Sequence, residues 1–340
     1  MATSEMTAAS VILAGDGPAL LTTPRAARLF LMAISGKLGA PRTDGDQSSA
    51  GLLYGPRATS RPGGKVAVLP LVGFLDQHPS ELLEWLGGTA TGVFGAAFDA
   101  AMADPAVRAV VLDVNSPGGS VFGTEELATK IAAARGTKPI IAVANSVAAS
   151  AAYWIAPAAD KLYVTPGGLV GSIGVVVFRE DATAIYDSMG VKVHVVAEGR
   201  YKAEGWPFVP MTEEERSHIQ SQVGEIYERF VGNVATNRGT TPYQVQKTFG
   251  QGRESSAKQA KSVGMVDGIK TLEQVLAATV KAAGGTGARA EEPASYESLL
   301  LAVASEIGEE ESCPIMDEEP AAGDPDAVEL ELDLRLRGLA

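Results

Sequence analysis

The sequence predicts an α/β fold with βαβ units and a mostly parallel sheet. From residue 64 to residue 283, short apolar runs alternate with stretches of helical periodicity, the pattern of βαβ units. One run, Val107 to Val114, is apolar except at Arg108 and Asp113, as in a parallel strand covered on both faces. The 38 glycines and the many alanines suit tight turns and close packing of helices on a sheet.

The same patterns predict the order of the elements. Strands are expected at Val66–Leu75, Val107–Val114, Pro139–Ala144, Lys161–Thr165, Gly174–Phe178 and Val191–Ala197. Helices are expected at Gly92–Ala103, Thr124–Ala134, Val147–Ala159, Asp181–Met189 and Thr212–Asn237. The last helix has the clearest pattern, because Thr212 and Glu215 make a capping box ahead of an apolar stripe. The stripe consists of Ile219, Val223, Ile226, Phe230 and Val234.

Composition divides the chain into three parts. Residues 1–63 contain a short helical pattern at Pro24–Leu38 and, at 41–63, a linker rich in Gly, Ser, Pro, Asp and Arg. Residues 64–283 form the folded body. Residues 284–340 form an acidic tail that is expected to be largely disordered. Its last segment, Val328–Leu336, alternates apolar and charged residues and is expected to dock on a partner.

The net charge of −13 lies in this tail, because Glu291 to Ala340 contain 15 acidic and 2 basic residues. The rest of the chain is neutral, which argues against nucleic acid or anionic lipid as a partner. The single cysteine, Cys313, excludes an intramolecular disulfide. No apolar run approaches the roughly 20 residues of a membrane span. We therefore expect a cytoplasmic protein without a membrane anchor, a metal or a cofactor.

A glycine-containing segment follows one of the expected strands. Asn115–Gly119 comes directly after Val114, where parallel sheets place their active sites. The paired glycines Gly118 and Gly119 can turn backbone N–H groups toward an anion, as an oxyanion hole requires. By itself, however, Pro-Gly-Gly is also an ordinary turn.

A serine lies in the corresponding position after the next strand. Ser150 is expected in the first turn of a helix, among small residues that let a substrate backbone approach. The N–H of Ala151 would point in the same direction as those of the glycine segment. Taken alone, Ser150 could equally be a buried helical serine in an alanine-rich contact.

Five segments in one order resemble peptidase family S49, the signal peptide peptidase A group of serine peptidases. They are Asn115–Gly119, Asn145–Trp154, Gly171–Val175, Glu198–Lys202 and Ala260–Asp267. The resemblance covers residues 64–283 and implies a Clp protease/crotonase-like fold. It also implies Ser150 as nucleophile, Lys202 as general base, Ser172 as the hydroxyl that orients the lysine, and Gly118, Gly119 and Ala151 as the oxyanion hole. One departure is that Ala151 and Ala152 stand where family members often have glycines, which narrows the pocket but keeps the N–H.

The chemistry agrees with these residue types. A serine hydroxyl needs a neighbouring base to take its proton. Lysine can serve when an apolar surrounding favours its neutral amine. The alternative, a Ser-His-Asp triad, has only His78, His194 and His218 to draw on, and none lies in a recognisable triad segment.

The N-terminal segment Leu20–Phe30, continuing through Gly36–Gly39, resembles the opening of the lambda-type phage head maturation proteases within this family. This favours an endopeptidase that cleaves capsid and scaffold proteins, with a tail related to scaffold. Two alternatives stay open: a soluble bacterial peptidase of signal peptides or membrane proteins, and a catalytically inactive assembly protein. The resemblance also implies a homo-oligomer in which the serine and lysine of different copies meet at subunit interfaces.

Overall fold

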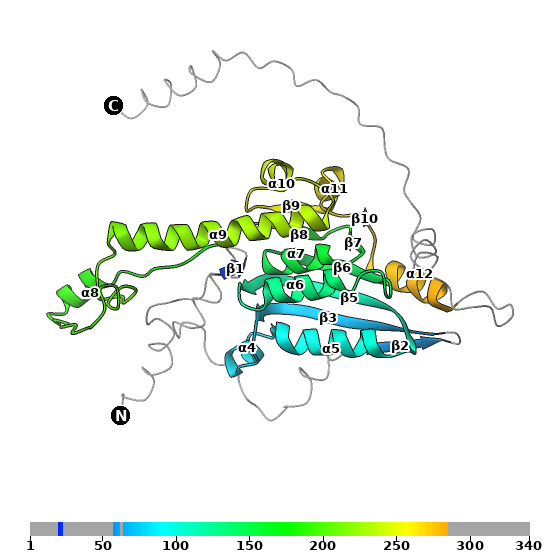
Figure 1. The fold of residues 1–340 in the computed structure, drawn as a ribbon, viewed down its shortest axis with the longest axis horizontal. Helices are drawn as coiled ribbons and strands as arrows, with labels where there is room; N and C mark the ends of the chain where they lie inside the picture. The colour runs from blue at the N-terminus through cyan, green and yellow to red at the C-terminus, as the bar shows by residue number, and fades with distance from the viewer. Residues whose placement is uncertain (1–19, 23–56, 62–63, 285–340) are drawn as a thin grey trace, which may run out of the picture. The chain divides into compact units, whose positions relative to one another are not determined.

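A computed structural model describes residues 20–22, 57–61 and 64–284, all within one compact unit, Met1–Glu309 (Figure 1). The strands are β1 (Leu20–Thr22), β2 (Arg57–Arg61), β3 (Gly64–Asp76), β4 (Thr89–Ala90), β5 (Val107–Ser120), β6 (Ile140–Ala149), β7 (Lys161–Val164), β8 (Leu169–Gly171), β9 (Glu254–Ser256) and β10 (Gly268–Ile269). The helices are α4 (Glu81–Trp85), α5 (Thr91–Ala103), α6 (Thr124–Ala133), α7 (Ala151–Ile155), the 3-10 turn η1 (Ala156–Ala158), α8 (Thr183–Ser188), α9 (Glu213–Asn237), α10 (Pro242–Thr248), α11 (Ala257–Ser262) and α12 (Leu272–Gly284).

The strands form one mostly parallel sheet, which confirms the predicted fold class. Its main order is β10-β7-β6-β5-β3-β2, and every neighbouring pair is parallel except β2–β3. The assignment of Arg57–Arg61 to a linker was wrong, because these residues form the antiparallel edge strand β2. Its polar sequence carries no strand signal, since an edge strand can be held by backbone pairing alone.

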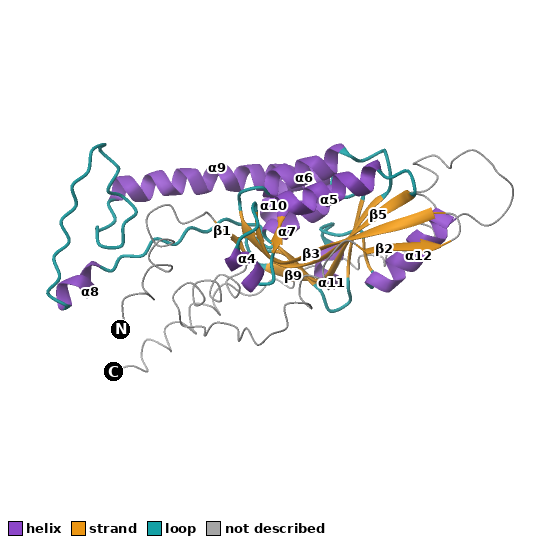
Figure 2. Cartoon of the chain, turned by 90° about the horizontal axis from the view of Figure 1, so that it is seen from below, coloured by secondary structure: helices purple, strands orange, loops and turns teal. Residues whose placement is uncertain are grey.

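The central strands are buried on both faces, as their continuous apolar runs predicted. Leu69 and Leu71 of β3, with Leu112 and Val114 of β5, face the core that is covered by α5, α6, α7 and α9. The alternate residues, such as Val66 and Val111, pack on the opposite face against α12 (Figure 2). The sheet is therefore a rigid central layer that fixes the ends of β5 and β6.

Two expected strands are absent. Gly174–Phe178 and Val191–Ala197 are not strands, and β8 (Leu169–Gly171) forms instead, between β6 and β9. The backbone groups of residues 192–198 make no hydrogen bond to any described residue. A strand needs a neighbour, and the described part of this single chain offers none to this segment.

Residues 179–212, called the arm below, lead out from the sheet to α8 and return to the start of α9. Figures 1 and 2 both place α8 beyond the sheet at the outer end of α9. The other half of α9 packs on α7, where Trp154 stacks on Phe230 with ring centroids 4.6 Å apart. Among the helices of the described ranges, none has the length and apolar character to cross a membrane. The helix expected at Pro24–Leu38 and the acidic tail after Gly284 lie outside those ranges.

Candidate active site

Ser150 stands at the turn between a strand and a helix. β6 runs to Ala149 and α7 begins at Ala151, so Ser150 is the N-cap residue, with φ 55° and ψ −119°. The helix expected from Val147 begins four residues later, because Val147 to Ala149 pair with β8. A non-glycine residue with these angles costs on the order of 1–3 kcal/mol, and such strain is concentrated at functional sites.

The Ser150 hydroxyl is buried and unpaired. The residue has no exposed surface, and its Oγ has no hydrogen-bond partner among the described residues. Its backbone is held firmly, because its N–H donates to the Gly171 carbonyl at 2.7 Å and its carbonyl accepts from the Trp154 N–H at 2.9 Å. A buried hydroxyl without a partner is costly, and here it coincides with the strained backbone of the same residue.

Ser172 lies next to this turn, since Gly171 directly contacts the Ser150 backbone. Ser172 is also buried and left-handed, with φ 54°, and its N–H donates to the Arg253 carbonyl at 2.9 Å. The described non-glycine residues with positive φ are Ser146, Ser150, Ser172 and Gln251. Ser146 lies in β6, Ser150 and Ser172 directly follow β6 and β8, and Gln251 lies in the loop before β9. Positive φ at the described non-glycine residues is therefore confined to this neighbourhood. The structure thus brings Ser150 and Ser172 together.

The glycine segment is part of the sheet and not a free loop as expected. β5 continues through Ser120, and Ser116 pairs with Ala148 of β6. Gly118 and Ser150 therefore each lie two residues beyond the last pair of two adjacent parallel strands. The Gly118 N–H is already used, because it donates to Ser116 Oγ at 3.1 Å, and that hydroxyl donates to the Gly73 carbonyl at 2.6 Å.

Gly119 is packed too closely for any side chain. A Cβ at this position would lie 1.9 Å from the Leu75 carbonyl oxygen. On the other edge of β5, β1 runs antiparallel along Gly118–Ser120, with Thr22 opposite Gly118. Ala151 is fully buried in the first turn of α7, where helix N–H groups have no partner within the helix.

Lys202 is not brought to Ser150 within one chain. It lies in the arm and is exposed, in a turn closed by its own N–H donating to the Gly199 carbonyl at 3.1 Å. Its neighbour Tyr201 donates to Glu214, at the start of α9, whereas α7 packs on Phe230 near the other end. Glu214 and Phe230 are 16 positions apart on this helix, a distance of about 24 Å along its axis. The sequence reasoning expected this separation within one chain.

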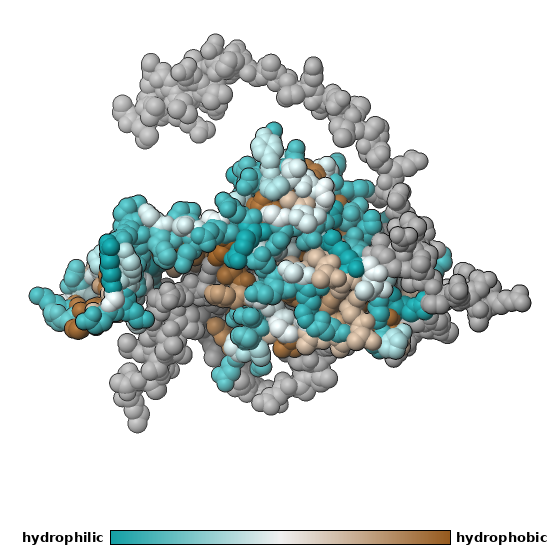
Figure 3. Space-filling model, viewed as in Figure 1, coloured by the Kyte–Doolittle hydropathy of each residue, from teal (hydrophilic) through white to brown (hydrophobic). Residues whose placement is uncertain are grey.

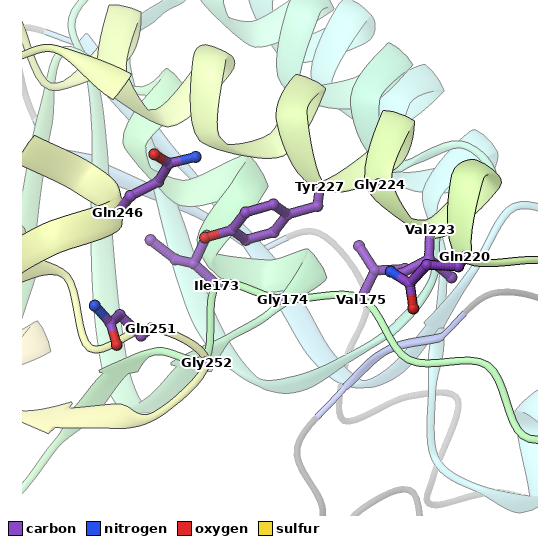
Figure 4. Close-up of a pocket in the computed structure, with 10 residues that line it drawn as sticks. All are labelled: Ile173, Gly174, Val175, Gln220, Val223, Gly224, Tyr227, Gln246, Gln251 and Gly252. Carbon is purple, nitrogen blue, oxygen red and sulfur yellow. The ribbon is translucent and has the colours of Figure 1, made fainter. Parts of the chain in front are cut away.

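A cavity of about 470 Å³ opens immediately after Ser172 (Figure 4). Its walls come from the segment after β8, from α9 and from the region around α10 and β9. They consist of Ile173, Gly174, Val175, Gln220, Val223, Gly224, Tyr227, Gln246, Gln251 and Gly252. Polar amides and one phenol line an otherwise apolar space, which suits an extended peptide side chain beside the serines.

The triad alternative finds no support in the geometry. His78, His194 and His218 are exposed and lie on separate elements, while the Ser150 hydroxyl bonds to none of them. In the described ranges, no group of three or more His, Cys, Asp or Glu side chains could hold a metal ion. The role of Ser116 was missed by sequence reasoning, because a serine before Pro-Gly-Gly gives no signal of the bridge that it forms.

Residues 132–285 match the model of peptidase family S49, and this domain includes the turn at Ser150, Ser172 and the arm. Over these residues the chain is therefore similar to peptidase family S49. Among its relatives, capsid assembly protease C of Escherichia phage lambda is 30% identical over 264 residues, 73% of this chain and 60% of that protein. Head-tail preconnector protein GP5 of Enterobacteria phage P21 is 28% identical over 296 residues, 81% of this chain and 59% of that protein.

Protease 4 of Salmonella typhi is 31% identical over 228 residues, 66% of this chain and 35% of that protein. The chain thus spans less than two thirds of the length of each of these three relatives. The chain is similar both to phage assembly proteins and to a bacterial protease. The similarity therefore does not choose between the phage role and the cellular role that the sequence left open.

Proposed function

We propose that this chain is a serine endopeptidase that uses a dyad of Ser150 and Lys202. The observation that carries the proposal is the buried, unpartnered Ser150 hydroxyl on a strained turn between β6 and α7. Ser116, by contrast, donates its hydroxyl proton to the Gly73 carbonyl and so bridges β5 to β3. The S49 domain and the names of the relatives support peptidase chemistry.

The mechanism begins with a proton transfer. Neutral Lys202 takes the Ser150 proton as Oγ attacks the scissile carbonyl carbon, and the carbonyl π electrons move to its oxygen. The N–H groups of Gly119 and Ala151 stabilise that oxyanion, because the Gly118 N–H already donates to Ser116. The lysine ammonium then protonates the leaving amine, which gives an acyl-enzyme. Water, deprotonated by the lysine, releases the acid and restores both residues. Ser172 orients the lysine.

The lysine comes from a neighbouring copy in this proposal. Ser150 Oγ lacks a hydrogen-bond partner, and Lys202 is exposed in the arm. The arm contacts α9 at Glu214, about 24 Å along the helix from Phe230, which stacks on Trp154 of α7. A lysine amine is neutral near pH 7 only when it is desolvated or placed near another cation. Docking of one copy's arm on the serine site of the next supplies this burial and gives Ser150 its missing partner.

Apolar side chains on the arm support such docking. Figure 3 shows apolar surface at the outer end of the arm, around α8, where Ile185 and Met189 are 59% and 68% exposed. Exposed valines alternate along the unpaired segment 192–198 and the residue before it, at positions Val191, Val193 and Val195. Val196, next to them, is 98% exposed. An apolar segment with unpaired backbone groups is suited to pair with a strand of a second copy of the chain.

The substrates in this proposal are capsid and scaffold proteins of a phage head, cleaved in the host cytoplasm during assembly. Two relatives carry names that refer to capsid assembly and to the head-tail connection. The tail after residue 284 would then dock on these partners. An active site completed only between copies delays proteolysis until subunits have gathered.

A cellular role as a peptidase of signal peptides or membrane proteins is the second candidate, favoured by the similarity to Protease 4. Co-expression with the capsid and scaffold proteins of neighbouring genes, followed by mass-spectrometric mapping of new termini, separates the two. Discrete cuts that disappear with Ser150→Ala support the phage role. Cleavage of signal peptides but not of those proteins supports the second role. Wild-type protein that cleaves nothing and does not react with a serine-directed phosphonate is an inactive assembly protein.

A further inference from the structure

A buried ion pair closes the root of the arm. Arg179 Nε donates to Glu215 Oε1 at 2.7 Å, and the two side chains are only 8% and 3% exposed. Thr212 caps α9 as the sequence predicted, since its Oγ1 accepts from the Glu215 N–H at 3.0 Å. The Glu215 carboxylate does not complete the capping box, however. It turns away from the helix start to the two sides of the arm.

These contacts join the outgoing and the returning sides of the arm. Arg179, on the outgoing side, also donates through Nη2 to the Val209 carbonyl of the returning side at 2.8 Å. The Gly205 N–H donates to Glu215 Oε1 at 3.2 Å. Gly205 lies three residues after Lys202, so the buried carboxylate holds the C-terminal end of the lysine turn.

The next carboxylate holds the other end of the turn. Glu214 accepts from Arg200 at 3.0 Å and from the Tyr201 hydroxyl at 2.6 Å. These groups are exposed, and exposed ion pairs contribute little. Removing one partner of a buried pair, in contrast, leaves an uncompensated charge and is strongly destabilising. The Arg179–Glu215 pair is therefore the dominant restraint on the segment that carries Lys202.

We propose that Arg179 and Glu215 are positioning residues for the general base: their ion pair fixes the Lys202 turn in the geometry that reaches a serine. This proposal rests on the proposed function, because it assigns no chemistry to the pair itself. Misplacing a reacting group by about 1 Å can cost 10²-fold in rate. The pair should therefore affect turnover more than substrate binding.

The test compares Glu215→Gln and Arg179→Lys with Glu213→Gln. Glu213 lies in the same helical turn but pairs only with exposed Arg216. The Arg179–Glu215 pair is called the clamp below. We expect kcat to fall about tenfold to a hundredfold in the two clamp variants, Glu215→Gln and Arg179→Lys, with KM nearly unchanged. In the Glu213→Gln control, kcat should stay within twofold of wild type. Clamp variants with wild-type kcat would overturn the proposal.

A mixing experiment separates positioning from a general folding defect. Ser150→Ala protein supplies the lysine to Lys202→Ala protein, which supplies the serine. Glu215→Gln added to the Ser150→Ala chain, which supplies the lysine, should lower the recovered activity about tenfold to a hundredfold. The same change in the Lys202→Ala chain should leave the recovered activity unchanged. Equal losses in both mixtures mean a merely structural role. If the parent mixture forms mixed oligomers without recovering activity, trans pairing in the proposed function fails. The comparison of kcat among the single variants then still tests whether the Arg179–Glu215 pair positions Lys202.

A second, independent observation concerns β1. At Gly118 and Gly119 one edge of β5 is taken by β3, through Phe74 and Leu75. β1 must therefore lie on the edge that β6 occupies up to the Ser116–Ala148 pair. Two residues after this pair, β5 reaches Gly118 and the chain of β6 reaches Ser150. At Gly118, however, the residue paired with β5 is Thr22 of β1. Residues 20–22 thus continue the line of β6 after it turns away at the serine.

We infer that Leu20–Thr22 occupy the place of an extended peptide substrate. A substrate must lie within reach of Ser150, and the edge of β5 beside it offers backbone pairing to one strand at a time. The chain's own segment therefore competes with substrates. This inference also rests on the proposed role of Ser150.

The test uses proline at adjacent positions, because neighbouring residues of a strand direct their N–H groups to opposite edges. One of Leu21→Pro and Thr22→Pro should lower KM for a short peptide severalfold with kcat unchanged, and a synthetic peptide of residues 16–26 should inhibit that variant competitively. Unchanged KM in both variants, with no inhibition, would overturn the inference. An inactive Ser150→Ala control in the same assay shows that the activity measured is that of the proposed site.

Discussion

The backbone N–H of Ser150 donates to the carbonyl of Gly171 at 2.7 Å, which ties the turn at the serine to the residue before Ser172. The two serines are 22 positions apart in sequence, and this bond joins Ser150 to the residue that precedes Ser172. A change that shifts β8 will therefore shift both hydroxyls together.

Ser150→Ala should abolish peptide cleavage by at least about 10⁴-fold. The free energy of unfolding should not fall, because the change deletes a buried oxygen that has no hydrogen-bond partner. Peptidase assays and urea denaturation measure the two effects. Residual wild-type turnover in the purified variant would exclude Ser150 as the nucleophile.

Lys202→Arg should be inactive, because a guanidinium stays protonated and cannot act as a base. Ser172→Ala should retain more activity than either dyad variant. An active Lys202→Arg enzyme would mean that another residue is the base.

Mixing Ser150→Ala with Lys202→Ala protein should restore activity, because some interfaces then combine one intact serine with one intact lysine. Each variant alone should stay inactive at every protein concentration. The mixture is assayed after native mass spectrometry has established that mixed oligomers form. A mixture that stays inactive despite such oligomers places the dyad within one chain.

Val193→Asp combined with Val195→Asp should give monomers without activity, since charges on the unpaired arm segment oppose its docking on another copy. Val93→Asp is the matched control, because Val93 is also exposed, at 58%, but lies on α5. Light scattering measures the mass of each variant. Oligomers in the arm variant equal to wild type would contradict the assigned interface.

Gly119→Ala should destabilise the fold by about 3 kcal/mol or more, because its Cβ would lie 1.9 Å from the Leu75 carbonyl oxygen. Gly167→Ala is the control, since a Cβ there has no heavy atom within 4 Å. Urea midpoints compare the two. Equal stabilities would mean that β5 and β3 separate locally without cost.

Much of the sheet was predictable because buried parallel strands are apolar throughout. β3, β5, β6 and β7 lie where the runs predicted them, and α9 begins after its predicted cap, Thr212. The ends of β5 and β6 were not predictable, because Asn115–Gly119 has turn composition and Val147–Ala149 was expected to begin a helix. Both segments are paired by the backbone of neighbouring strands. Val191–Ala197 has a strand sequence but lacks a neighbour in the described chain, which no local pattern can reveal.

The candidate site followed from motif order and not from local pattern. Ser150 and Ser172 were assigned by resemblance, and the structure brings them together. The clamp of Arg179 and Glu215 could not be predicted, because its partners are separated by 36 positions and Glu215 already had a local explanation as a capping residue. Tertiary packing redirected that carboxylate from the helix start to the arm.

The unpaired segment 192–198 has a consequence for how the protein must be made. Unpaired backbone groups in an exposed apolar segment are a template for pairing with another chain, and such pairing begins aggregation. Lys192 and His194, which alternate with the valines, interrupt the apolar edge but do not remove it. Subunits that have not assembled leave this segment exposed and will therefore precipitate more readily than assembled subunits. Expression together with assembly partners should raise the yield of recoverable protein.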